Sequence, residues 1–132
     1  MFLKDIREWL KEKVNDSEVS FFIGKIDASK EKVIGVYNRP GNKNKIAVGG
    51  LENTSTANKT ICILVHWNKN CDTSERAAKG IYDLFNGNKA VINNVNAFFV
   101  MKNDEPIGVG TDSTDIYEFT IDLNITYGRN DN

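Results

Sequence analysis

Histidine, cysteine and proline are scarce in this sequence, whose 132 residues include one, two and two of them respectively. Two cysteines are too few for a disulfide scaffold, and Cys62 and Cys71 do not form a CxxC pair. We therefore predict free thiols in a protein of cytosolic origin. His66, the only histidine, forms with Cys71 and Asp72 neither a metal-ligand cluster nor a familiar nucleophile–base pair. A packed or partly exposed strand residue is the expected role of His66.

Long apolar runs are also missing. No segment approaches the roughly 20 apolar residues that span a bilayer, so no membrane partner is expected. The net charge is −1, but residues 1–60 carry eleven Lys/Arg against eight Asp/Glu (+3), and residues 61–132 carry six against ten (−4). Opposed charge in the two halves suits head-to-tail packing of copies, although surface charge usually serves solvation alone.

Two amphipathic helices are predicted. The first begins at Phe2 and ends around Asn15, with apolar residues at helical spacing. The second begins after an N-cap at Asp72, has Glu75 at the third helical position and is stopped by Gly87. Its apolar residues are Ala77, Ala78, Ile81, Leu84 and Phe85.

Six further segments are predicted to be strands. They are residues 19–26, 32–37, 60–68, the hairpin 90–95 with 97–102, and the long terminal run 116–127. Residues 60–68 are apolar on both faces, which predicts a central strand. Residues 103–115 are expected to form a flexible acidic loop. Helices mixed with hairpin-connected strands predict the α+β class, with a mostly antiparallel sheet and two main helices packed on it, in one domain over residues 1–132.

A polar, glycine-rich stretch at about residues 38–58 is predicted to form a flexible arm. Arg39, Lys43 and Lys45 lie in this arm with few opposing charges. A solvated loop is one interpretation, and contact with nucleic acid or with an acidic neighbouring subunit is the other. The terminal residues 128–132 are expected to be disordered.

No catalytic pattern emerges from the remaining charged and glycine-rich segments. The carboxylate pairs Asp112/Asp115 and Glu118/Asp122 lie in a loop and on one wet strand face, where nothing predicts a substrate cleft. Gly108-Val109-Gly110 precedes a strand, so it lacks the helix N-terminus that a phosphate site needs. We expect neither enzymatic activity nor a cofactor.

Four stretches of the chain are informative when they are taken together. They are Phe2–Leu10, Val33–Gly41, Ile61–Phe85 and Tyr117–Ile125. In this order they resemble the tail terminators of long-tailed phages and phage-like particles, a family of minor capsid or tail-completion proteins. The resemblance covers most of the chain, although the arm departs from the family over residues 49–58.

The resemblance implies a structural virion assembly protein, made in the bacterial cytoplasm and incorporated in the particle. It would form a ring, typically a hexamer, that caps the tail tube, provides the surface for head joining and lets DNA pass through its lumen. Its expected partners are further copies of itself, the tail tube protein and head-completion or connector proteins.

These expectations assign places to eight polar residues. Arg39, Lys43, Lys45, Asp112 and Asp115 are the candidate residues for subunit or partner contacts. Because like charge opposes tight phosphate binding, an acidic strand face suits a DNA channel. An ordinary solvated face is the alternative, and the lumen-facing candidates are Glu118, Asp122 and Asn124.

A different class of function is a monomeric protein-binding module, toxin-neutralising or regulatory.

Overall fold

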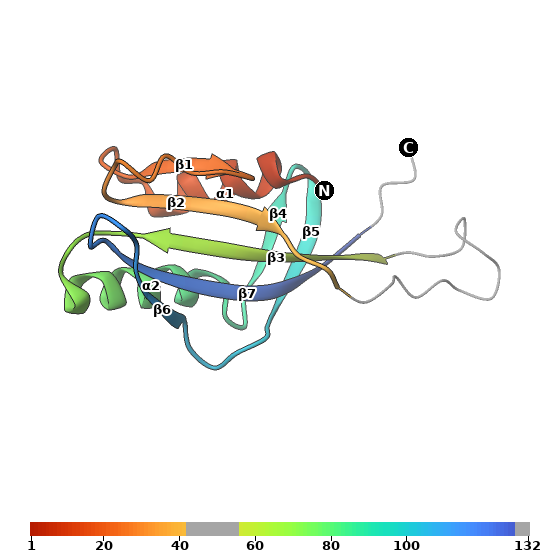
Figure 1. Cartoon of the computed structure of the whole chain (residues 1–132). Helices are drawn as coiled ribbons and strands as arrows, with labels where there is room; N and C mark the ends of the chain where they lie inside the picture. The colour runs from red at the N-terminus through yellow and green to blue at the C-terminus, as the bar shows by residue number, and fades with distance from the viewer. Residues whose placement is uncertain (42–55, 129–132) are drawn as a thin grey trace.

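The computed structural model describes residues 1–41 and 56–128, which form two helices and seven strands (Figure 1). This is the α+β class predicted from the sequence. The elements are α1 (Leu3–Val14), β1 (Ser20–Ile23), β2 (Val33–Asn38), β3 (Thr56–His66), α2 (Cys71–Phe85), β4 (Lys89–Ile92), β5 (Val95–Met101), β6 (Ile107–Thr111) and β7 (Tyr117–Gly128).

All seven strands belong to one sheet in the order β1-β2-β3-β7-β5-β4, with β6 also paired to β7. Every pairing is antiparallel except that of β1 with β2. The sheet is curled, because β4 and β5 run steeply across the direction of β2, β3 and β7 (Figure 1). Long strand β7 pairs with β3 along its full length, which confirms that β3 is central.

Both helices pack on one face of the sheet and complete the core. Trp9 of α1, Phe85 of α2 and Phe99 of β5 meet there, with ring centroids 5.0–5.3 Å apart. The alternation of β7 is as predicted, since Phe119, Ile121, Leu123 and Ile125 are buried in this core. The opposite face of the sheet, which we call the open face, carries the polar residues of β7.

Local sequence signals predict the end of α1 correctly but misplace the start of α2. Helix α1 ends as predicted, because Asn15 adopts a left-handed conformation (φ 48°) and its backbone N–H bonds to the carbonyl of Lys11. Helix α2 begins two residues earlier than predicted. Its N-cap is Asn70, whose side chain accepts a hydrogen bond from the backbone N–H of Thr73, so the prediction of Asp72 as N-cap was wrong.

The β4–β5 hairpin is tighter than predicted. Only Asn93 and Asn94 connect the strands, with φ of 51° and 62°. Two positive φ angles in a two-residue loop are the geometry of a type I′ turn, which asparagine tolerates better than most residues. The sequence suggested the hairpin, as residues 90–95 with 97–102, but placed its turn less precisely.

Two segments expected to be irregular contain strand structure. Strand β6 lies within the predicted acidic loop, and β3 begins at Thr56, inside the predicted arm. Two glycines explain why the sequence pattern did not predict β6. Gly108 packs beneath the Phe119 ring, and a bulge with Gly110 at φ 91° interrupts the alternation. The remainder of the predicted arm after Gly41 and the predicted tail after Gly128 lie outside the described residues.

The connection between β1 and β2 crosses the open face. Parallel strands require such a crossover, and here it is only residues 24–32. Ile26 of the crossover lies over Gly35, where an added Cβ would approach the Ile26 side chain to 2.6 Å. A glycine at position 35 therefore allows the connection to lie close to the sheet and to cover one end of the open face.

Candidate assembly surface

The open face carries a polar strip along β7. Its residues are half-buried, because neighbouring strands lie on both sides. The strip includes all three residues that the sequence suggested for a lumen wall. Its members are Glu118, Thr120, Asp122, Asn124 and Thr126.

Arg39 reaches this strip from the end of β2. Its Nε lies 3.6 Å from Oδ1 of Asp122, and its Nη2 lies 3.5 Å from Sγ of Cys62. The Cys62 contact and the Asp122 charge keep the pKa of Arg39 above its ordinary value, while burial raises the pKa of the Cys62 thiol. Arg39 and Asp122, assigned to separate surfaces from the sequence, thus form one ion pair. Lys43 and Lys45 lie outside the described residues.

Asn124 also has a partner across the strands. The Thr60 hydroxyl donates to Oδ1 of Asn124 at 2.5 Å. A Cβ added to Gly41 would overlap that same hydroxyl, so the chain after β2 lies against the open face at this point. The polar strip is therefore a surface of matched charges and amides, with less free negative charge than the sequence suggested.

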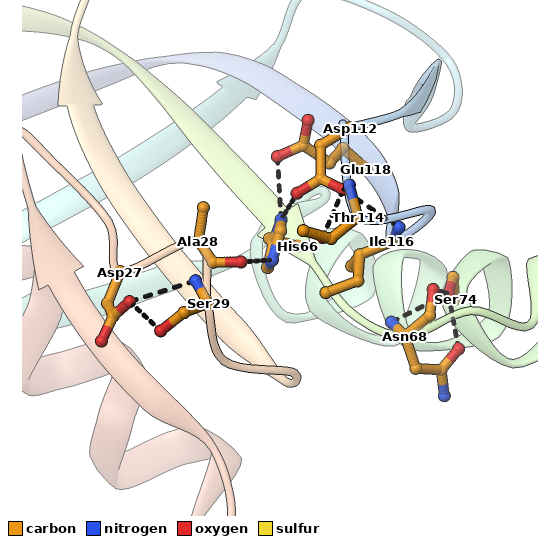
Figure 2. Close-up of polar contacts among 10 residues, drawn as sticks. All are labelled: Asp27, Ala28, Ser29, His66, Asn68, Ser74, Asp112, Thr114, Ile116 and Glu118. Atoms are coloured by element: carbon orange, nitrogen blue, oxygen red, sulfur yellow. Dashed lines mark hydrogen bonds and ion pairs between the residues drawn. The ribbon is translucent and has the colours of Figure 1, made fainter.

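At the covered end of the open face lies His66, whose side chain is 0% exposed (Figure 2). Its Nδ1 is 3.0 Å from Oε2 of Glu118 and 3.7 Å from Oδ2 of Asp112. Its Nε2 is 3.2 Å from the Ala28 carbonyl of the crossover. Both ring nitrogens therefore face oxygen atoms, and which nitrogen donates depends on the tautomer. His66 thereby connects the β1–β2 crossover to the start of β7, a role that the sequence left open.

Asp112 organises the turn that precedes β7. It accepts hydrogen bonds from the Thr114 side chain and backbone at 2.7 and 2.8 Å and from the Ile116 backbone at 3.1 Å. These bonds, with the nearby His66, hold the pKa of Asp112 below its ordinary value, so its carboxylate form is favoured. Asp115 lies in the same turn with φ 64°, exposed to solvent. The turn explains both aspartates structurally, and their part in subunit contacts stays a prediction.

Beside the polar strip lies a row of exposed apolar side chains, which we call the apolar stripe. Phe98 and Val100 of β5 stand opposite Thr126 and Asn124 of the strip, and Ile107 of β6 stands opposite Thr120. Val91 of β4 is 63% exposed and extends the row to the sheet edge. Several exposed apolar side chains on one face of a small protein indicate a contact surface.

The stripe was not recognised from the sequence. Its signal was present in part, because Phe98 and Val100 alternate with the buried Phe99 and so must point to the other face. Ile107 was hidden in the segment expected to be a flexible loop.

The described surface offers side chains suited to contacts with other proteins. Within residues 1–41 and 56–128, no group of three or more His, Cys, Asp or Glu side chains is placed to hold a metal ion. No helix in these same ranges is long and apolar enough to cross a membrane. What the open face offers is a polar strip with satisfied charges and an apolar stripe next to it.

The family of the chain follows from a comparison with known protein families. The sequence matches the family model of the bacteriophage tail terminator protein over residues 4–129. The chain belongs to this family. A search of curated proteins finds no significant match.

Membership of the tail terminator family confirms the resemblance found in the sequence. It makes the protein a structural component of the phage tail, and hence of the virion, with other tail or head proteins as its partners. Of the two classes of function drawn from the sequence, the family supports the structural one.

Proposed function

We propose that this tail terminator assembles in the bacterial cytoplasm into a ring, typically a hexamer, which caps the tail tube and provides the surface for head joining. The observation that carries the proposal is the apolar stripe. Val91, Phe98, Val100 and Ile107 are between 41% and 63% exposed and lie on the same face of the sheet. Contact between subunits would remove this apolar surface from water, with roughly 25 cal/mol gained per Å² buried.

In the proposed ring, the apolar stripe contacts a neighbouring subunit and the polar strip lines the channel. Arg39 is paired with Asp122, and Asn124 is bonded to Thr60. Phosphates passing along such a wall would meet few free cations to bind and little free negative charge to repel them. This balance suits a channel through which DNA slides, with Glu118, Asp122 and Asn124 in its wall as the sequence suggested.

Joint replacement of Phe98 and Val100 by glutamate is expected to abolish ring formation. Both side chains are exposed, so the change costs the folded subunit little, whereas two buried carboxylates would oppose the contact. Ring formation is measured by negative-stain imaging and by mass from light scattering over a range of concentrations.

Glu75→Lys is the matched control, because it changes a charge on the exposed face of α2, away from the open face. It should leave ring formation intact. Rings that form equally well in the Phe98/Val100 double variant would show that the apolar stripe is not the subunit contact. A wild-type protein that stays monomeric, alone and with tail tubes, would refute the ring itself.

A further inference from the structure

In residues 1–41 and 56–128, the strands at the two ends of the sheet each have one paired side and one free edge. In the described residues, β1 pairs only with β2, and β4 pairs only with β5. An uncovered edge presents unpaired N–H and C=O groups to any chain that can pair with them. A contact between two different surfaces of successive copies forms a closed ring when the repeated rotation between copies returns to the first copy.

A groove runs along the free edge of β4. It lies between this strand and α1, and two adjoining cavities of about 900 and 600 Å³ share Trp9, Glu12 and Val91 in their walls. Cavities of this size accommodate sizeable ligands in other proteins. The groove thus gives access to the β4 edge, and its wall includes an aromatic ring.

The hydrogen bonds of the hairpin show which groups of β4 point into this groove. In antiparallel strands, consecutive residues bond alternately to the partner strand and away from it. The two-residue turn makes Ile92 and Val95 the closing pair, and Phe99 bonds through its N–H to the Asn88 carbonyl at 3.3 Å. The N–H and C=O of Val91 and Lys89 therefore point outward, and both side chains lie on the open face.

The free edge of β1 has the complementary pattern. Ser20 donates its N–H to the carbonyl of Lys32, just before β2, and Gly24 donates its N–H to the carbonyl of Val36 in β2. By alternation, the backbone groups of Phe21 and Ile23 point outward, and the side chains of Ser20 and Phe22 lie on the open face. In a parallel pairing, a residue of one strand bonds to the two residues that flank its opposite number. Val91 opposite Phe22 of a second copy would therefore bond to Phe21 and Ile23 of that copy.

We propose that β1 of one copy adds to the β4 edge of the next as a parallel strand, joining the sheets around the ring. This proposal deepens the proposed function, on which it rests, by naming the surfaces that meet. The strand directions agree with it. From the strand pairings, β1, β2, β7 and β4 share one sense and β3 and β5 have the opposite one. A second copy that continues the sheet beyond β4, with its open face on the same side, would therefore place its β1 parallel to β4.

Disulfide trapping tests the pairing in a Cys71→Ser background, which removes the exposed native thiol. Ser20, Lys89 and Val91 place their side chains on the open face, and opposite residues on paired strands come near enough for a disulfide. The Ser20→Cys variant is mixed with Lys89→Cys in one sample and with Val91→Cys in another, which covers the two adjacent registers. Oxidation should link the copies in one of the mixtures, whereas each variant alone should remain unlinked.

Proline substitution provides the second measurement. Val91→Pro removes an outward N–H without breaking the β4–β5 ladder, and proline is tolerated on edge strands. We expect it to raise the concentration for half-assembly at least tenfold, whereas Val91→Ser, which keeps the N–H, should raise it much less. Equal assembly of the two variants, or disulfides formed by Val91→Cys alone, would overturn the proposal.

The two proposals fail in different ways. Rings without a disulfide in either mixture would overturn the strand pairing and leave the ring intact. Linked copies that form open chains and do not cap tail tubes would support the pairing and refute the capping ring.

Discussion

Replacing Phe99 by alanine is expected to lower the free energy of unfolding by about 3–5 kcal/mol. Phe99 is 1% exposed and its ring meets both Trp9 and Phe85, so it joins the two helices to the sheet. Truncation would leave a cavity at the centre of the core and remove the edge-to-face contact with Phe85. The midpoint and slope of a urea unfolding curve measure the change.

The adjacent residue is a matched control for this prediction. Phe98 has the same side chain but is 42% exposed on the open face. Phe98→Ala should cost about 1 kcal/mol or less in the isolated subunit, since truncation of an exposed side chain leaves no cavity. Similar losses for both variants would contradict the burial of Phe99 and the assignment of the open face.

Replacing His66 by alanine is expected to cost about 2–4 kcal/mol of stability, because the change removes the partner of Glu118 and of the Ala28 carbonyl. Loss of these bonds also frees the crossover from the start of β7. Amide hydrogen exchange should therefore show faster exchange in residues 24–31 and 112–118 than in α2. A double-mutant cycle with Glu118→Gln should give a coupling energy of about 1–3 kcal/mol.

The outcome of the cycle separates two roles for His66. Additive effects of His66→Ala and Glu118→Gln, with exchange unchanged in the crossover, would mean that His66 only fills space. A coupling energy between the two substitutions, together with faster amide exchange confined to the crossover and the start of β7, would show that the histidine connects these segments.

The sequence predicted those elements whose periodicity is uninterrupted. The terminal strand alternates from Tyr117 to Tyr127, and β7 follows it with its apolar residues in the core. The apolar residues of α2 likewise determined which face of that helix is buried. Strand β6 escaped because Gly108 and Gly110 carry no side chain to show the pattern.

Helix α2 shows why boundaries are harder to predict. Asn70, Asp72 and Thr73 are all suitable N-cap residues within four positions, and only the backbone geometry chooses among them. The parallel direction of β1 also leaves little trace in a strand of four residues.

Contacts between distant residues account for what the sequence could not predict about the candidate site. Arg39 pairs with Asp122, and His66 with Glu118, across strands that are far apart in the chain. The sequence shows each of these residues separately, as a charged or titratable side chain. Which of them meet depends on strand order and register, which no local pattern contains.

The length of tail tubes assembled from the cognate tube protein tests the central claim most directly. Tubes are grown with and without this protein, and their lengths and ends are measured in electron micrographs. The account predicts that added protein stops elongation and appears as a ring at one end of each tube, while the Phe98/Val100 double glutamate variant does neither. Tubes that elongate equally in the presence of the wild-type protein, with bare ends, would contradict it.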